Sequence, residues 1–176
     1  MKSTGVVRRV DDLGRIVIPK EIRRTLRIRD GESLEIFVDR EMIALKKFSK
    51  MTDMDEISKQ LVDIVNTVIH QNVFITDRDN FIAGSGDLRK KYLGKPISKS
   101  LELIMKERKT IVEHSLHSIE LCDSVPENYA YVICPVIMNG DAIGLVLIVS
   151  DSSDIGQVEE KMADVVSKFL GKHIEE

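Results

Sequence analysis

The arginines of the first 30 residues are the side chains best suited to bind another molecule. A guanidinium group binds phosphate oxygens and base edges with two parallel hydrogen bonds, and each phosphate that it neutralises releases counterions. Residues 1–50 hold 13 Lys and Arg against 8 Asp and Glu, a net charge of +5, whereas residues 51–176 hold 13 against 21, a net charge of −8. This asymmetry predicts a polyanion-binding segment joined to a unit that stays off the polyanion. A solvated basic face without a partner is the alternative.

The other reactive side chains do not assemble into a catalytic or metal site. Cys122 and Cys134 have apolar neighbours, which is typical of core residues rather than of a redox pair. His114 and His117 are three residues apart near the expected end of a helix, with no carboxylate in a metal-ligand pattern. The sequence therefore predicts no catalytic residue, no metal and no cofactor, and a protein that is not an enzyme.

Short strands and one short helix must hold the arginines. β-branched residues and turn signals alternate along the segment, with turns at Asp11–Gly14 and Asp30–Gly31, and Pro19 suits the first turn of a helix. The expected order is two strands, a helix and two further strands: residues 4–10, 15–18, 20–26, 34–38 and 42–45.

Fifty residues in such short elements cannot bury much apolar surface. A domain of this size is marginal alone, and the segment has no Cys or His with which to add a disulfide or a metal. The remaining route is obligate dimerisation, in which the hairpins of each chain complete the core of the other. A dimer also doubles the arginines about a two-fold axis, which suits a groove of DNA.

Residues 7–26 read VRRVDDLGRIVIPKEIRRTL. They closely resemble the DNA-binding domain of AbrB-type transition-state regulators, and the resemblance continues through residues 34–38 and 45–47. It implies a swapped-hairpin β-barrel dimer that binds double-stranded DNA. By its length and its C-terminal half, the whole chain is also similar to sporulation regulators that carry this domain and act as activator or repressor depending on the promoter.

The resemblance also implies which residues contact DNA. The arginines used for this purpose in the family match Arg8, Arg15, Arg23 and Arg24 here, with Arg9 as a further basic neighbour. None of the expected helices carries a dense array of side chains for reading base edges. We therefore expect a domain that reads groove shape and deformability more than a strict base sequence.

Two amphipathic helices are expected in the second part of the chain. Asp53 and Glu56 suit a capping box for a helix over residues 54–69, and the same apolar spacing predicts a helix over residues 155–170. Packed together and against a second copy, they would form a four-helix bundle and join dimers into a tetramer. The alternative is that they only cover the sheet of their own domain. The seam residues are Met54, Ile57, Leu61, Ile64 and Val68 in the first helix and Ile155, Val158, Met162, Val165 and Phe169 in the second.

A mixed sheet-and-helix unit is expected between these helices. Asn139-Gly140 is a strong hairpin signal, and Pro135 requires a bulge or an edge position in the strand before it. The expected elements are strands over residues 72–77, 81–84, 118–122, 129–138 and 142–150 and a helix over residues 99–107. Residues 133–148, ICPVIMNGDAIGLVLI, resemble the closing hairpin of GAF domains, modules that often bind a small molecule over their sheet.

Together these features predict an α+β protein with an AbrB-like DNA-binding domain over residues 1–52 and a GAF-like sensor and oligomerisation domain over residues 53–176. No apolar run reaches the ~18 residues that span a bilayer, and no signal peptide is evident, so we expect a cytoplasmic protein without a membrane partner. We expect a transcription regulator that an unidentified small-molecule ligand modulates. Two alternatives stay open: a GAF-like domain that is empty and only oligomerises, and an N-terminal domain that belongs to an antitoxin-type binding protein.

Overall fold

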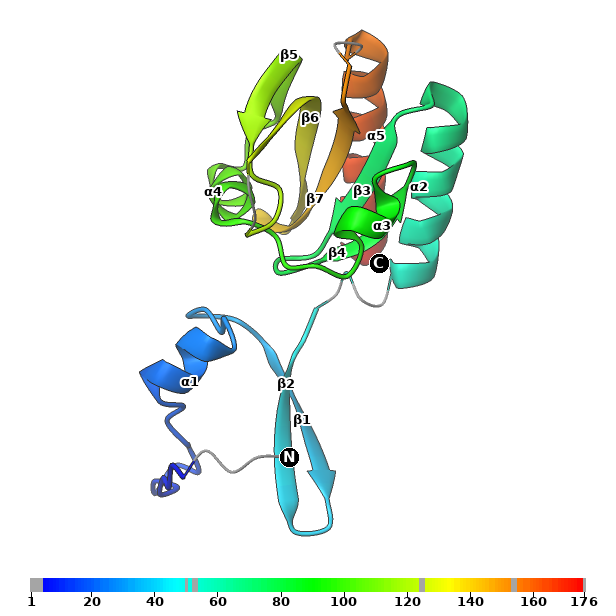
Figure 1. Ribbon diagram of the computed structural model, residues 1–176. Coiled ribbons are helices and arrows are strands. Elements are labelled where there is room, and N and C mark those ends of the chain that lie inside the picture. The colour runs from blue at the N-terminus through cyan, green and yellow to red at the C-terminus, as the bar shows by residue number, and fades with distance from the viewer. Residues whose placement is uncertain (1–4, 50, 52–53, 124–125, 153–154, 176) are drawn as a thin grey trace. The chain divides into compact units, whose positions relative to one another are not determined.

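The computed structural model describes residues 5–49, 51, 54–123, 126–152 and 155–175, and the chain divides into two compact units, Met1–Phe48 and Ser49–Glu176 (Figure 1). In the first unit, helix α1 (Lys20–Thr25) begins directly after Pro19, whose φ of −56° suits a helix start. Strands β1 (Leu34–Asp39) and β2 (Met42–Lys47) form an antiparallel hairpin. The helix and the second pair of strands expected from the sequence are therefore confirmed.

The first pair of expected strands, over residues 4–10 and 15–18, is not formed in the single chain. Residue 4 lies outside the described residues, and residues 5–18 contain no strand. The turn between them is present: Gly14 N donates to Asp11 O at 2.9 Å, and Gly14 adopts a φ of +74°, which glycine tolerates. A strand needs a neighbour for its backbone N–H and C=O groups, and no described strand of the same chain pairs with residues 7–10 or 15–18. The prediction is therefore wrong for an isolated chain.

The first unit has no core of its own. None of residues 5–49 is buried. Large apolar side chains face solvent throughout the unit; Val7 is 83% exposed on the N-terminal arm (residues 5–10), and Val38 is 74% exposed on β1. Burial of apolar surface contributes about 25 cal/mol per Å², so the single chain leaves most of this stabilisation unused.

The second unit is built on a five-stranded antiparallel sheet of order β4–β3–β7–β6–β5. Its strands are β3 (Asn72–Thr76), β4 (Phe81–Ser85), β5 (Ile111–Ile119), β6 (Glu127–Met138) and β7 (Asp141–Ser150). The longest pairing joins β6 to β7 through Asn139 and Gly140, which both have positive φ as a tight two-residue hairpin turn requires. The hairpins expected at β3–β4 and at β6–β7 are confirmed.

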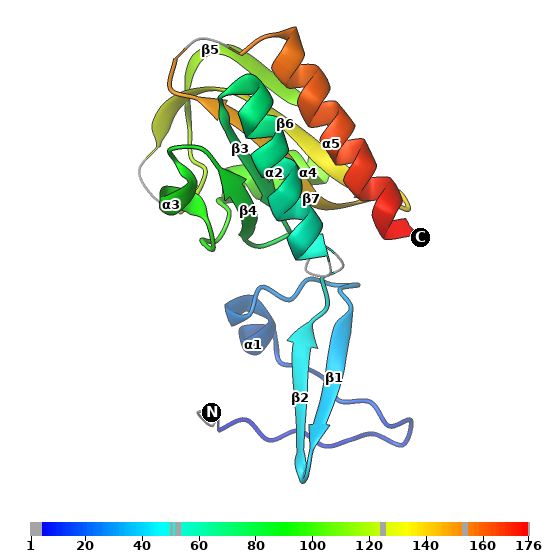
Figure 2. The ribbon, with the colours of Figure 1, turned by 90° about the vertical axis from the view of Figure 1, so that its right-hand side faces the viewer.

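Helices cover both faces of this sheet. Figure 2 shows two of these helices side by side on one face of the sheet, and these two helices also contact each other. The other two helices lie on the opposite face. The helices are α2 (Asp55–Ile69) and α5 (Gln157–Glu175) on the first face and α3 (Arg89–Tyr92) and α4 (Lys99–Glu107) on the second.

Alternation along the strands divides the core between the two faces. Successive strand residues point to opposite sides of a sheet, so Ile75 packs in a cluster with Val62 of α2 and Leu170 of α5. Its neighbour Phe74 packs in a second cluster with Tyr92 of α3. The sheet is therefore buried on both sides, with one aliphatic face and one aromatic-rich face.

The faces that α2 and α5 turn to the sheet only partly coincide with the expected seams. Val65 of α2 and Val166 of α5 are buried against the sheet, although neither belongs to a predicted seam. Some residues of the predicted seams are buried or half-buried, whereas other seam residues remain exposed. The exposed seam residues are Ile64, Val68, Val158, Val165 and Phe169.

Three details of the second unit differ from the expectation or bear on it. The strand expected over residues 118–122 lies earlier, as β5, so His114 and His117 are strand residues rather than residues near a helix end. Pro135 lies beyond Ile133, the last β6 residue paired with β5, which gives it the expected edge position on that side. The capping box cannot be placed because Asp53 lies outside the described residues.

Candidate nucleic-acid interface

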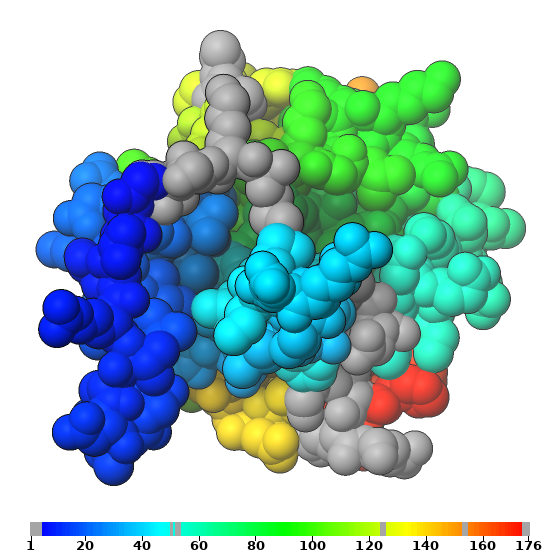
Figure 3. All heavy atoms as spheres, turned by 90° about the horizontal axis from the view of Figure 1, so that it is seen from below, coloured from blue at the N-terminus to red at the C-terminus, as the bar shows by residue number. Residues whose placement is uncertain are grey.

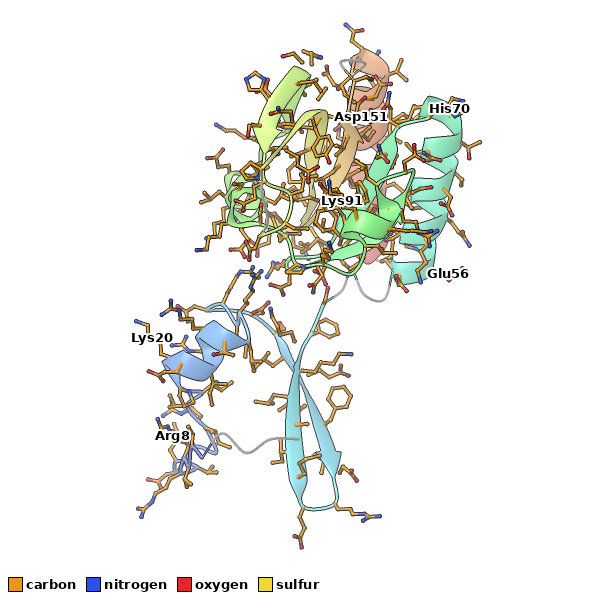
Figure 4. The ribbon with its side chains drawn as sticks, in the orientation of Figure 1. Arg8, Lys20, Glu56, His70, Lys91 and Asp151 are labelled. Atoms are coloured by element: carbon orange, nitrogen blue, oxygen red, sulfur yellow. The ribbon has the colours of Figure 1, made fainter. Side chains whose placement is uncertain are left out.

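Arg8 and Arg9 lie on the arm that precedes the first turn, and both side chains are exposed. Arg8 Nη1 donates to the carbonyl O of Val7 at 3.2 Å. In the space-filling view the dark-blue arm lies at the surface, and Figure 4 labels Arg8 on it (Figures 3 and 4). Neither guanidinium forms an ion pair with any described residue, so both are available to a polyanion.

Arg15 follows the turn and is held by the carboxylate of Asp11. Arg15 Nε donates to Asp11 Oδ2 at 2.7 Å, and the Arg15 backbone N–H donates to Oδ1 at 2.8 Å. Oδ1 also accepts from Leu13 N at 3.0 Å. The hydrogen bonds from the Arg15 backbone and side chain hold the pKa of Asp11 below its usual value, so its carboxylate stays ionised at neutral pH.

Arg23 and Arg24 lie in the last turn of α1. Arg23 Nη1 donates to Asp30 Oδ1 at 2.5 Å, and Arg23 Nε is buried without a partner among the described residues. Arg24 is exposed and makes no side-chain hydrogen bond or ion pair with a described residue. The helix ends two residues before Arg27, which has a φ of +52°. One arginine of this pair is thus held by an aspartate, whereas the other is open to solvent.

The five arginines form three groups: on the arm, after the turn and on α1. Within the described ranges, no side-chain hydrogen bond or ion pair joins one group to another. Two of the five, Arg15 and Arg23, are each paired with an aspartate. The single chain therefore presents separate cationic contact points, and a second copy would double each of them.

Sequence reasoning missed the acids that hold these basic side chains. Asp11 and Asp30 were expected only as turn residues. Glu32 is nearly buried; it accepts from Arg29 N at 2.9 Å and lies 3.8 Å from Lys47 Nζ, so Arg29 and Lys47 help to fix the loop before the hairpin. The signal that could have found the Asp11 pair is an acid four residues before an arginine across a turn.

A polar cluster in the second unit lies on the sheet face covered by α3 and α4. Glu127 accepts hydrogen bonds from Lys91 Nζ and, at 2.6 Å, from the hydroxyl of Tyr129, which lies 3.1 Å from the hydroxyl of Tyr92. Lys91 and Tyr129 hold the pKa of Glu127 below its usual value, and burial is the main cause that raises the pKa of Tyr129 to about 12. Sequence spacing does not indicate this cluster, because Lys91 and Glu127 are 36 residues apart.

The two cysteines are core residues. Cys122 and Cys134 are buried, and burial raises the pKa of both thiols, which keeps them protonated at neutral pH. Over the described ranges, no group of three or more His, Cys, Asp and Glu side chains is placed to hold a metal ion. In the same ranges, no helix has both the length and the apolar character needed to cross a membrane.

Comparison with known protein families gives one match for each part of the chain. The family described as "Stage V sporulation protein T C-terminal, transcription factor" matches residues 53–175. The family described as "Antidote-toxin recognition MazE, bacterial antitoxin" matches residues 7–51. The first match covers more than half of the chain, and the second covers about its first quarter.

Individual relatives agree with this division. The chain is 44% identical over 178 residues to stage V sporulation protein T of Bacillus subtilis (strain 168), and the alignment covers 100% of both chains. Its first part is 65% identical over 48 residues to the transition state regulatory protein AbrB of the same organism, covering 27% of this chain and 50% of AbrB. The resemblance to AbrB-type regulators is therefore confirmed.

The fold of the second unit recurs in solved structures. The GAF domain/HD domain protein from Geobacter sulfurreducens aligns with a TM-score of 0.55 and 17% identity, covering 74% of this chain and 99% of that one. At this identity the similarity concerns the fold alone. It confirms the expected GAF-like domain and, with the AbrB match, the α+β class.

Proposed function

The chain belongs to the stage V sporulation protein T family, and we propose that it is a DNA-binding transcription regulator of sporulation that activates or represses depending on the promoter. The domain over residues 1–52 binds double-stranded DNA. The domain over residues 53–176 is a sensor and oligomerisation domain. One observation carries this proposal: none of residues 5–49 is buried, and this unit presents a set of arginines at its surface. The proposed DNA contacts are Arg8, Arg9, Arg15, Arg23 and Arg24.

The DNA-binding domain is a dimer built by exchange of hairpins. A two-stranded hairpin such as β1–β2 is marginally stable alone in water, and its apolar side chains are exposed on both of its faces. Residues 7–10 of the arm include β-branched residues, but no described strand of the same chain pairs with them. A second copy supplies both the missing strands and the missing core.

The dimer reads DNA mainly by shape. Helix α1 is only six residues long, and its two DNA-binding candidates are arginines rather than a varied set of base-reading side chains. Arginines on an arm, a turn and a short helix suit phosphates and a narrow groove. The preferred sites are therefore degenerate in sequence.

The GAF-like domains associate through α2 and α5 and join two dimers into a tetramer. Ile64 and Val68 of α2 and Val165 and Phe169 of α5 are exposed apolar residues on two helices that contact each other. Exposed apolar residues on neighbouring helices are typical of an interface. Linking two DNA-binding modules raises the effective concentration of the second at a nearby site.

A small molecule bound by the GAF-like domain modulates DNA binding by shifting how the modules are held. The proposed place of the ligand is the face covered by α3 and α4, where Lys91, Glu127 and Tyr129 pair with one another beside the aromatic cluster. The competing hypothesis is an empty domain that only oligomerises. A ligand screen that reads the thermal unfolding midpoint separates the two.

The regulator acts in the cytoplasm, and we assign it no catalytic step. Its two thiols are buried and protonated, which makes them poor nucleophiles. The antitoxin family matches only residues 7–51, whereas the sporulation relative aligns over the whole chain. This difference favours a regulator over an antitoxin.

DNA binding tests the proposal directly. A duplex is selected from a random pool, and its affinity for the full chain is measured over a series of salt concentrations. Arg15→Ala combined with Arg23→Ala should weaken binding at least about 100-fold. The slope of log affinity against log salt should fall by about 0.9 for each phosphate that the variant no longer neutralises.

The matched control removes the same charge from the second unit. Lys90 and Lys106 are exposed there, so Lys90→Ala combined with Lys106→Ala should change affinity less than about twofold at physiological salt. Parental affinity in the arginine variant would contradict the proposed contacts. An equal loss in both variants would mean that net charge alone governs binding.

A further inference from the structure

Asp11 is the first residue of the turn over Asp11–Gly14, and its carboxylate accepts hydrogen bonds from three N–H donors. Oδ1 accepts from Leu13 N at 3.0 Å and from Arg15 N at 2.8 Å, and Oδ2 accepts from Arg15 Nε at 2.7 Å. Its backbone joins the same turn, because Asp11 N donates to Arg15 O at 3.0 Å. The carboxylate therefore fixes both the turn and the side chain that follows it.

This pairing leaves the distal part of Arg15 open. Its Nε–H is used by Asp11, but neither Nη atom has a hydrogen-bond partner among the described residues, and the side chain is 70% exposed. A guanidinium that is held through Nε keeps its plane while it presents the four Nη–H donors outward. An unheld arginine would lose side-chain freedom on binding, whereas this one has lost part of it already.

An aspartate beside a DNA contact is unfavourable on charge alone. Phosphates repel a carboxylate, so a residue kept there for solubility or turn formation would weaken binding. The neighbouring Asp12 provides the comparison. It has the same charge and is exposed, but its side chain makes no hydrogen bond or ion pair with a described residue. Of these two acids, Asp11 alone gains an interaction with an arginine in return.

We infer that Asp11 is a positioning residue for DNA binding, which holds the guanidinium of Arg15 by Nε so that its Nη atoms face the DNA backbone or a base edge. The inference rests on the proposed function, because it needs Arg15 to contact DNA. It deepens that function by assigning a role to an acid within a basic surface.

The test measures the DNA affinity of the full chain and asks whether the loss of one negative charge weakens or strengthens binding. Asp11→Asn and Asp12→Asn each remove one negative charge per chain from the same turn. In Asp11→Asn the new amide keeps Oδ1 as an acceptor for the backbone of Leu13 and Arg15, but its Nδ2 cannot accept from Arg15 Nε. Asp11→Asn should weaken binding to the selected duplex by about fivefold, whereas Asp12→Asn should leave it unchanged or tighten it.

A variant with Arg15→Ala distinguishes a role of Asp11 in positioning Arg15 from a role of Asp11 in folding. If Asp11 acts through Arg15, adding Asp11→Asn to Arg15→Ala should cause no further loss and should behave as the Asp12→Asn change does. Thermal unfolding and far-ultraviolet circular dichroism of each variant report whether the domain is still folded.

Each outcome decides between distinct conclusions. If the Asp11→Asn variant binds DNA as tightly as the Asp12→Asn variant, the inference is overturned, and the proposed arginine contacts are unaffected. A loss that persists without Arg15 also overturns it, because Asp11 would then act on the fold. If Arg15→Ala itself binds like the parent, the proposed contact fails, and the inference fails with it.

Discussion

Glu127 is a carboxylate of the second unit whose ionisation depends on its neighbours. It accepts hydrogen bonds from Lys91 and Tyr129, residues brought to it from α3 and from its own strand. These donors lower its pKa in the folded chain. A lowered folded pKa contributes stability that is present above the unfolded value of about 4.3 and is lost as the pH falls through the folded value.

Glu127→Gln should therefore matter at neutral pH and cease to matter in acid. We expect the unfolding midpoint of the second unit to fall by about 2 °C at pH 7, because a partly exposed ion pair contributes less than about 1 kcal/mol. The difference from the parent should shrink below about pH 4. Glu107→Gln, at an exposed residue of α4, is the control and should show no such dependence. A constant difference across the pH range would exclude the charge as its cause.

The candidate DNA contacts could be predicted from the sequence, but the residues that hold them could not. Arginine type, spacing and family resemblance are enough to indicate Arg15 and Arg23. Asp11 and Asp30 occupy positions where aspartate is common in turns whether or not it binds a side chain. Local spacing therefore cannot distinguish an acid that only shapes the turn from one that also orients an arginine.

At the scale of elements, apolar periodicity predicted helices α2 and α5 but not what each of their faces contacts. Val65 is buried on the sheet, whereas its neighbour Ile64 is exposed. A helix that packs on a sheet and also on another molecule has a wide apolar surface, and its sequence does not say where one contact ends. The structure shows by burial which apolar residues face the sheet and which stay exposed.

The exposed part of this surface leads to a test of association. Val165 on α5 is 61% exposed, and Leu103 on α4 is 59% exposed. Val165→Lys should weaken self-association at least about tenfold, because it places a charge where the proposed interface would bury an apolar side chain. Leu103→Lys is matched in exposure and should have no effect. Sedimentation velocity over a range of concentrations measures both, and equal behaviour of the two variants would remove α5 from the interface.

Strand prediction failed where pairing or regularity is missing. Residues 7–10 and 15–18 have the composition of strands, yet in the single chain they have no described strand to pair with. Strand β5 was placed too late because its register shifts between Glu113 and His117. That irregularity removes the alternation of exposed and buried residues on which strand prediction depends.

The whole molecule joins a basic unit without a core to an acidic unit with a complete one. The second unit buries both faces of its sheet, whereas residues 5–49 bury nothing. The sequence shows the same contrast as net charges of +5 over residues 1–50 and −8 over residues 51–176. The dimer and the tetramer expected from the sequence stay predictions, because the number of chains depends on how exposed surfaces of separate copies meet.

We propose that two copies of the N-terminal domain together bind one DNA site. Native mass spectrometry of the full chain with a short selected duplex tests it most directly, because the mass of the complex counts its chains. We expect two or four chains on one duplex, and loss of these complexes when Arg15 and Arg23 are both replaced by alanine. A single chain on the duplex as the main species, or no duplex-bound species from the parent, would contradict the claim.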